Sequence, residues 1–208
     1  MKILNLYAGI GGNRFLWNDE HQITAVEINS DVVEIYKNYF PNDNVIIGDA
    51  HQYLIENSDD FDMIWSSPPC PTHSRMMKGT RHKIRKYPDM KLYQEIIFLQ
   101  HFYQGKWVVE NVMPYYTPLI EQNLKVDRHL FWCDSHTELN FKKPSIPNKK
   151  DFIMTATIKG RKSLFKWLDI PIHDKIVYYE GSHDPCSILR KAVHPKIGKA
   201  IMDSWNVV

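Results

Sequence analysis

Strand and helix patterns alternate along the first 112 residues, and this alternation constrains the fold more than any other feature of the sequence. Apolar spacing typical of helices occurs at 30–40 and 91–103. Short apolar runs typical of strands lie at residues 2–7, 23–28, 44–48, 61–65 and 106–112. Such alternation indicates βαβ units, in which helices cover both faces of a parallel sheet. The sequence therefore predicts an α/β fold with a parallel-type sheet.

The pattern changes after Val112, where two prolines interrupt it. Beyond this point we expect antiparallel strands at 129–133 and 151–158. A segment rich in proline and lysine, 143–150, predicts a loop between them. The last pattern, at 195–206, predicts a closing helix that begins with proline.

Two segments carry most of the positive charge. Residues 75–91 hold seven lysines or arginines and one acid, and residues 142–166 hold eight and one. The remainder has 11 basic and 22 acidic residues, so the two segments stand out against an acidic body. Clustered lysine and arginine are typical of surfaces that bind a polyanion such as nucleic acid. The alternative is two flexible, solvated loops.

The cysteines and the hydropathy pattern exclude several classes of protein. Cys70, Cys133 and Cys186 form no CxxC pair, which argues against a disulfide framework and predicts no structural metal site. An odd number of widely separated cysteines indicates a reducing, cytoplasmic location. No run approaches the about 20 apolar residues of a membrane span, and the first residues do not resemble a signal peptide, so we expect no membrane association.

The ends of the first three predicted strands carry residues suited to a nucleoside. LYAGIGG, at 6–12, is a strand followed by a glycine turn, where glycine allows positive φ and close approach of a ligand. Glu27 ends the second strand, where an acid can accept hydrogen bonds from ribose hydroxyls. Asp49 follows the third strand and suits an adenine amino group, while Ala50 offers a backbone N–H. No Lys-Ser or Lys-Thr follows the glycines, so triphosphate binding is disfavoured and S-adenosylmethionine fits better.

Cys70 and Glu110 follow the fourth and fifth predicted strands, so both should face the same edge of the sheet. Pro68 and Pro69 should hold Cys70 in a stiff loop. A cysteine thiolate that attacks C6 of cytosine makes C5 nucleophilic enough to accept a methyl group, and a protonated carboxyl beside the ring nitrogen assists that attack. The alternative for Cys70 is a buried, inert thiol.

Six motifs stand in the order found in the DNA cytosine-5 methyltransferases, which this chain resembles. They are LYAGIGG, AVEIN, GDAH, SPPCPTHS, VVENV and LRKAVHPKIGKAI. The resemblance implies a Rossmann-like S-adenosylmethionine-dependent methyltransferase fold, a covalent adduct with Cys70 and extrusion of the target base from the duplex. It also implies that Glu110 protonates N3 of cytosine, with Ser74, Asn111 and Arg128 completing the catalytic set. The implied cofactor contacts are Tyr7, Ala8, Gly9, Ile10, Gly11, Gly12, Glu27, Ile28, Asp49, Ala50, Pro69, Leu92, Ala192 and Val193.

Three places depart from the family pattern. Pro-Thr-His-Ser follows Cys70 in place of the usual Gln-x-Phe-Ser, and we interpret His73 and His82 as exposed loop histidines. The family's Arg-x-Arg strand keeps one arginine, Arg128, and Leu130 stands where the second would be. The pair that replaces Gly-Asn in the closing motif is Arg190 and Lys191.

The resemblance divides the chain into a cofactor-binding and catalytic domain at 1–133, a short target-recognition region at 134–185 and a returning C-terminal helix at 186–208. So short a region predicts a recognition site of about two to four base pairs, or nearly relaxed specificity. The segment 75–91 matches the family's mobile catalytic loop. The residues expected to contact the nucleic-acid backbone are Arg75, Arg81, Lys83, Arg85, Lys86, Lys159, Arg161 and Lys162.

The main interpretation is a bacterial or phage-type enzyme that methylates C5 of cytosine in double-stranded DNA, with a possible restriction or recognition partner. The first alternative is methylation of tRNA, which one branch of the family performs. The second is methylation of an exocyclic nitrogen, but those enzymes use an Asp/Ser-Pro-Pro-Tyr/Phe motif and need no cysteine. The third is a non-catalytic DNA-binding subunit, against which Cys70 and Glu110 argue.

Overall fold

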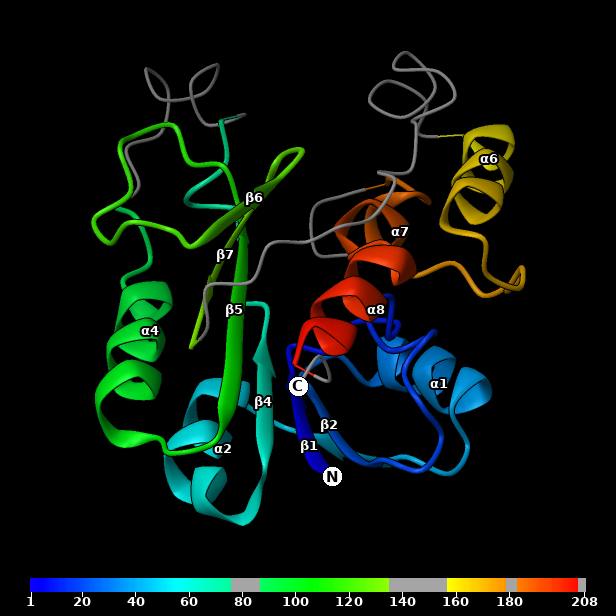
Figure 1. Cartoon of the computed structure of the whole chain (residues 1–208). Coiled ribbons are helices and arrows are strands. Elements are labelled where there is room, and N and C mark those ends of the chain that lie inside the picture. The colour runs from blue at the N-terminus through cyan, green and yellow to red at the C-terminus, as the bar shows by residue number, and fades with distance from the viewer. Residues whose placement is uncertain (76–86, 135–156, 179–182, 206–208) are drawn as a thin grey trace.

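The computed structural model describes residues 1–75, 87–134, 157–178 and 183–205. Its strands are β1 (Lys2–Leu6), β2 (Gln22–Glu27), β3 (Asn44–Ile47), β4 (Met63–Ser66), β5 (Lys106–Val112), β6 (Leu124–Val126) and β7 (His129–Cys133). They form one seven-stranded sheet with the order β3-β2-β1-β4-β5-β7-β6 (Figure 1). β1 to β5 pair in parallel, and β7 pairs antiparallel with β5 and β6. The predicted α/β fold with a parallel-type sheet is therefore confirmed.

The parallel strands end level with one another at one edge of the sheet. Leu6, the last residue of β1, pairs with Val26 of β2 and with Ser66 of β4. Ser66 pairs in turn with Val109, the residue before Glu110 in β5. The strand order reverses between β1 and β4, and open α/β sheets bind ligands at the carboxyl edge beside such a reversal. This edge is where the site has to be sought.

Helices cover both faces of the sheet (Figure 1). They are α1 (Ser30–Tyr39), α2 (Ala50–Asn57), α4 (Lys91–Phe102), α6 (Ile158–Leu168), α7 (Ser187–Lys191) and α8 (Pro195–Ser204), with a 3₁₀ turn, η1 (Ser58–Asp60), after α2. Successive side chains of a strand point to opposite faces. Leu4 and Leu6 of β1 accordingly pack with α2 and α4, and Ile3 packs with α8.

Most of the described part of the expected recognition region lies at 157–178, and this segment is anchored to the cofactor half of the fold. Thr157 begins α6 by accepting a hydrogen bond from the N–H of Gly160 at 3.1 Å, a typical N-cap. Apolar side chains of α6 and α7 then share one buried cluster with α1. The cluster consists of Ile10, Val32, Ile35, Leu164, Phe165, Leu168, Ile170, Val177, Cys186, Ile188 and Leu189.

The strands and helices predicted within the first 112 residues are confirmed, with bounds that differ by at most two residues. The strand at 129–133 and the closing helix are confirmed as β7 and α8. The prediction of a strand at 151–158 is wrong for its last two residues, because Thr157 caps helix α6 and Ile158 begins it. Residues 151–156 and the predicted loop at 143–150 lie outside the described residues. The sequence patterns did not predict α2, β6, α6 or α7.

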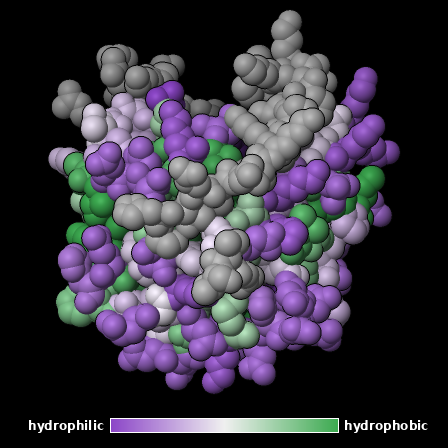
Figure 2. Space-filling model, in the orientation of Figure 1, coloured by the Kyte–Doolittle hydropathy of each residue, from purple (hydrophilic) through white to green (hydrophobic). Residues whose placement is uncertain are grey.

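Polar side chains cover most of the face seen in Figure 2, and its hydrophobic side chains form separated groups. Two of the exposed apolar side chains, Ile97 and Phe102, belong to α4. Within the ranges that the structure describes, no helix is both long and apolar enough to cross a membrane.

Candidate active site

The Cys70 loop is held at the carboxyl end of β4 by its own turn and by β5. The carbonyl oxygen of Cys70 accepts hydrogen bonds from the N–H groups of His73 and Ser74, each at 3.0 Å. Asn111 of β5 donates from Nδ2 to the carbonyl oxygen of Pro68 at 2.9 Å. Because the two prolines before Cys70 also fix φ, the loop has a defined position beside β5. The predicted residues Cys70, Ser74 and Asn111 are thus brought together.

The interpretation of His73 as an exposed loop histidine is wrong. His73 is 1% exposed, and its Nδ1 forms a 2.5 Å hydrogen bond with the hydroxyl of Tyr116. The turn after Cys70 directs this ring inward, at the position where the family pattern has phenylalanine. Burial lowers the pKa of His73 below its usual value, although Asp89 opposes the shift. His73 is therefore a neutral core residue beneath the loop, and His82 lies outside the described residues.

The thiol of Cys70 is partly buried and lies in the field of three charged side chains. Burial raises its pKa above the ordinary value, the Glu110 carboxylate raises it further, and Lys191 and Arg128 act in the opposite direction. Cys70 and the three charged side chains come from four separate segments of the chain, yet they interact with one another. The thiol is mostly protonated at neutral pH, so the two cations are the groups that favour the reactive thiolate.

Glu110 forms a buried pair with His129, which the sequence interpretation did not include. Oε1 of Glu110 is hydrogen-bonded to Nδ1 of His129, and the two residues are 6% and 9% exposed. Arg128 donates from Nε to Nε2 of the same ring at 3.3 Å. Since arginine has only donors, Nε2 is the acceptor and the ring proton is assigned to Nδ1. His129 therefore donates to Glu110.

Arg128 reaches the site, whereas the position expected for a second arginine does not. Nη2 of Arg128 donates to the carbonyl oxygen of Arg190, which ties β7 to α7. Leu130 is 2% exposed and belongs to the hydrophobic cluster under α2 and α4. Alternation along β7 points Leu130 away from the face that carries His129. A cation at position 130 would lie in the core, so Arg128, which directly precedes β7, is the arginine that this segment brings to the site.

The glycines of the turn after β1 have two different roles. A Cβ on Gly11 would lie 2.4 Å from the Phe40 ring, and one on Gly12 would lie 2.5 Å from the carbonyl oxygen of Val193. These two glycines permit packing against α1 and the closing motif. Gly9 has a φ of +55°. Apart from its neighbours in the chain, the nearest atom to the position that its Cβ would occupy is the carbonyl oxygen of Tyr7, at 4.0 Å. Gly9 is thus the glycine that leaves room for a ligand.

Glu27 and Ile28 lie at the carboxyl end of β2, in positions that suit a nucleoside. Glu27 is nearly buried, and its carboxylate accepts the N–H groups of Gly9 and Asn29, each at 3.0 Å. An ionised carboxylate has about four acceptor positions, so it can still accept from ribose hydroxyls. Ile28 is 72% exposed at the end of β2, where a heteroaromatic ring can cover it.

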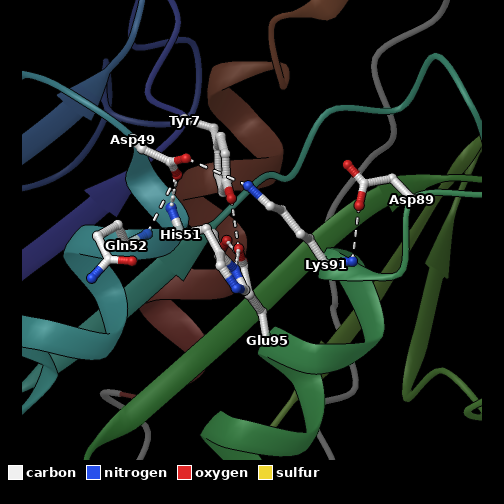
Figure 3. A network of polar contacts seen from close by, with 8 residues as sticks. Tyr7, Asp49, His51, Gln52, Asp89, Lys91 and Glu95 are labelled. Carbon is white, nitrogen blue, oxygen red and sulfur yellow. Dashed lines mark hydrogen bonds and ion pairs between the residues drawn. The ribbon is translucent and has the colours of Figure 1, made fainter.

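Asp49 and Ala50 stand at the start of α2, next to Glu27's strand. Oδ1 of Asp49 caps the helix by accepting the N–H groups of His51 and Gln52, and Oδ2 forms an ion pair with Lys91 at 3.4 Å (Figure 3). Burial raises the pKa of Asp49, but these N–H groups and Lys91 outweigh it and the net shift is downward. The N–H of Ala50, in the first helical turn, has no intrahelical acceptor. An acceptor and a donor therefore lie side by side, as an adenine edge requires.

The buried carboxylate of Glu95, on α4, connects the ends of β1 and β4 with α2, beside the candidate cofactor residues (Figure 3). Its Oε1 accepts from the hydroxyl of Tyr7 at 2.6 Å and from Nδ1 of His51 at 2.9 Å. Its Oε2 accepts from the hydroxyl of Ser66 at 2.5 Å. Burial and the Glu95 charge raise the pKa of Tyr7, which keeps its hydroxyl a donor. Tyr7 itself has a φ of +55°, so this hydrogen bond secures an unfavourable backbone conformation.

The remaining cofactor candidates divide into those at the edge and those in the core. Ala192 and Val193 return to the glycine turn as expected, in contact with the position of Gly12. Pro69 is exposed beside Cys70. By contrast, Ala8 is 7% exposed, and Ile10 and Leu92 are buried members of hydrophobic clusters.

The candidate nucleic-acid residues also divide. Arg75 is exposed, and so are Lys159 and Lys162 on α6. Arg161 does not fit a phosphate contact, because it is 4% exposed and its guanidinium donates to the carbonyl oxygens of His173 and Lys175. The helical repeat turns position 161 toward the core while 159 and 162 face solvent. The candidates Arg81, Lys83, Arg85 and Lys86 lie outside the described residues.

Two residues that the sequence interpretation missed had a visible signal. His129 is a polar residue in the apolar strand HLFWC, on the face that period-two alternation shares with Phe131. Glu95 is a lone acid among the apolar residues of α4. Buried charges are rare unless they are paired, so each such residue indicates a partner that only the fold identifies.

Solved structures resemble the whole chain. The Dnmt2 methyltransferase of S. pombe superposes with a TM-score of 0.58 at 12% identity, covering 97% of this chain and 96% of that one. The methyltransferase EhMeth of Entamoeba histolytica gives a TM-score of 0.57 at 11% identity, covering 98% and 97%. At such identities the likeness concerns the fold, which is Rossmann-like and that of S-adenosylmethionine-dependent methyltransferases.

Curated relatives resemble part of the chain. A tRNA (cytosine(38)-C(5))-methyltransferase of Mus musculus is 30% identical over 82 residues, and one of Spodoptera frugiperda is 35% identical over 80 residues. Each match covers 36% of this chain. The chain spans 20% and 24% of the length of these relatives.

The family assignment comes from the part of the chain that carries the glycine turn, Cys70 and Glu110. A model of the family described as "C-5 cytosine-specific DNA methylase" matches residues 1–126, more than half of the chain. Within this range lie the glycine turn, the Cys70 loop and the Glu110 strand that form the candidate site. The chain therefore belongs to the C-5 cytosine-specific DNA methylase family.

Proposed function

We propose that this protein transfers a methyl group from S-adenosylmethionine to C5 of cytosine in a polynucleotide. The observation that carries the proposal is the strand register and the Asn111–Pro68 hydrogen bond that hold the Cys70 loop beside Glu110, at the sheet edge that also holds Gly9 and Glu27. Nucleophile, carboxyl and candidate cofactor residues thus share one edge, although they come from four different strands. S-adenosylmethionine, the methyl donor of the family, supplies an electrophilic methyl group when bound.

The roles of the chain's own residues follow from their chemistry. The Cys70 thiolate forms a bond with C6 of cytosine, while N3 takes a proton from Glu110. This makes C5 a nucleophile. After methylation, C5 loses its proton to water, the electron pair of that bond expels the Cys70 thiolate from C6, and N3 returns its proton to Glu110. Lys191 and Arg128 favour the thiolate at the start and at the end of this sequence. Asn111 holds the Cys70 loop against β5 throughout.

Two substrates are candidates, and tRNA is the first. The order of the sequence motifs favours duplex DNA, and the family description supports it. The curated relatives are tRNA (cytosine(38)-C(5))-methyltransferases, which supports the alternative of an RNA substrate more directly. In either case, exposed lysines such as Lys159 and Lys162 on α6 suit phosphate, a contact that adds affinity without sequence information. A reducing, cytoplasmic location is part of the proposal and agrees with three cysteines that form no CxxC pair.

The test is an intact-mass assay with S-adenosylmethionine and 5-fluorocytosine in two substrates, tRNA transcripts and duplex DNA of mixed sequence. Fluorine at C5 prevents the final loss of a proton, so attack by Cys70 leaves a covalent protein–nucleic-acid adduct. We expect an adduct with the tRNA, none with Cys70→Ala, and cofactor binding by Cys70→Ala that calorimetry finds unchanged. An adduct with DNA alone would make duplex DNA, and not tRNA, the favoured substrate. No adduct with either, despite cofactor binding, would contradict the proposed function.

A further inference from the structure

The pairing register of β5 and β7 brings His129 to Glu110. Glu110 lies opposite Phe131, and Val112 lies opposite His129. Side chains at 110, 112, 129 and 131 therefore share one face of the sheet, and Glu110 and His129 are diagonal neighbours. Long side chains at diagonal positions can meet. The resulting hydrogen bond joins Oε1 of Glu110 to Nδ1 of His129.

This contact uses one of the two oxygens of Glu110. Within the residues that the structure describes, Oε2 of Glu110 has no hydrogen-bond partner. Oε1 is occupied by the N–H of His129, so a proton on the carboxyl group belongs on Oε2. That oxygen is the one left to meet N3 of a cytosine held beside Cys70.

Cationic side chains lie around the pair of Glu110 and His129. Arg128 donates to Nε2 of His129 at 3.3 Å, so this nitrogen is the acceptor and the ring proton is assigned to Nδ1. The other ionisable groups that face this region are Cys70 on the β4 loop and Lys191 and Arg190 on α7. Two of these groups are cations. His129 is thus the donor to Oε1, and Oε2 is the oxygen through which Glu110 can exchange a proton with a substrate.

We propose that His129 is a positioning residue for Glu110, which fixes the carboxyl group so that Oε2 presents the proton to N3 of cytosine. The inference rests on the proposed function, since it assigns a partner to the proton donor of that reaction. When Cys70 Sγ bonds to C6, the proton moves from Oε2 to N3, and the N–H of His129 stabilises the carboxylate that results. When Sγ leaves, the proton returns from N3 to Oε2, and His129 keeps its own proton in both steps.

Two variants separate positioning from simple packing. His129→Leu removes the donor and keeps an apolar side chain of similar size. His129→Asn keeps an amide N–H close to the position of Nδ1, so it can still donate to Oε1. If the leucine variant does not fold, His129→Gln replaces it, because its longer amide reaches the place of Nε2 instead. Thermal melting of each variant establishes that the fold is intact.

The first measurement needs no substrate. Carbon-13 NMR follows the side-chain carboxyl groups of glutamate against pH, and Glu110→Gln identifies the Glu110 signal. Loss of a donor to the ionised form makes a carboxyl group harder to ionise. We expect the Glu110 midpoint to move to higher pH in His129→Leu and to remain near that of the wild type in His129→Asn. Equal midpoints in all three proteins would overturn the hydrogen bond that the proposal requires.

The second measurement is the pH profile of kcat/KM for methyl transfer. We expect His129→Leu to lose about 10²-fold, the lower end of the range for proton transfer by a positioned side chain, with the limb set by Glu110 displaced to higher pH. His129→Asn should stay within about tenfold of the wild type. An asparagine variant as slow as the leucine variant, with an unshifted profile, would overturn the positioning role. A wild type that transfers no methyl group, with the NMR shift present, would instead contradict the proposed function.

Discussion

Two buried glutamates in this protein each pair with a histidine, and the difference between them separates support from chemistry. Glu95 has both oxygens occupied, by Tyr7 and His51 on Oε1 and by Ser66 on Oε2. Glu110 has His129 on Oε1. In the described part of the chain its Oε2 has no partner. Both carboxylates are buried at the same edge of one sheet, so burial does not distinguish their roles.

The distinction lies in what each carboxylate leaves unsatisfied. A carboxylate oxygen without a protein partner that is not sealed from solvent is available to accept from, or donate to, a ligand. The full set around Glu95 fixes Tyr7 and α2 before any ligand arrives. The incomplete set around Glu110 leaves an oxygen for a substrate. We therefore expect substitutions at Glu95 to alter stability and those at Glu110 to alter turnover.

The largest expected effect is at Glu110. Glu110→Gln should lower kcat by about 10²- to 10⁴-fold, the range expected when a positioned proton donor is lost. The midpoint of thermal unfolding should change little, because glutamine keeps the size and an acceptor for His129. Steady-state methyl transfer and circular dichroism measure the two quantities. A turnover close to that of the wild type would remove Glu110 from the chemistry and end the comparison.

Glu95→Ala should produce the opposite result. Three donors would lose their buried acceptor, and we expect a loss of about 3 kcal/mol in the free energy of unfolding. Affinity for S-adenosylmethionine should fall as well, because Tyr7 loses its support. Urea titration and calorimetry measure these changes, with Glu95→Gln as a milder control that keeps one acceptor. A stable variant that binds the cofactor normally would show that the network around Glu95 is dispensable.

A third test concerns pH and the histidine beneath the Cys70 loop. Burial holds the pKa of His73 below the roughly 6.5 of an unfolded histidine. The unfolded chain therefore binds more protons as pH falls below that value, and the stability present above it is lost on acidification. His73→Phe should reduce the difference in unfolding free energy between pH 7.5 and pH 5.5. An undiminished difference would assign the acid sensitivity to other groups, such as the buried His194.

The smallest expected effect is on the thiol that faces Glu110. Lys191 lowers the pKa of Cys70 against the combined influence of burial and Glu110. Lys191→Asn should therefore raise the thiol pKa and slow alkylation by iodoacetamide at pH 8 by about threefold, as for one partly screened charge. The rate measured against pH gives the midpoint directly. An unchanged midpoint would mean that Arg128, and not Lys191, is the cation that lowers the pKa of Cys70.

The fold and much of the site could be predicted because the relevant patterns are local. Period-two and helical spacing identified the strands and helices of the first 112 residues, and strand order then placed Cys70, Glu110, Glu27 and Asp49 at one edge. Helix α2 escaped prediction because its eight residues have a weak apolar pattern, and its start depends on a cap at Asp49. Arg161 was misassigned because a cluster of positive charge does not reveal which side chain turns inward.

The sequence by itself determined the α/β class, the family and the pair Cys70 and Glu110, since short-range periodicity and contiguous motifs encode them. The tertiary structure alone decided which partners these residues have. His129 meets Glu110 through antiparallel register, and Glu95 gathers Tyr7, His51 and Ser66 from three elements. Such contacts join residues 19 to 88 positions apart in the chain, so no local pattern carries them. They form because burying a carboxylate requires donors, and packing determines which donors are within reach.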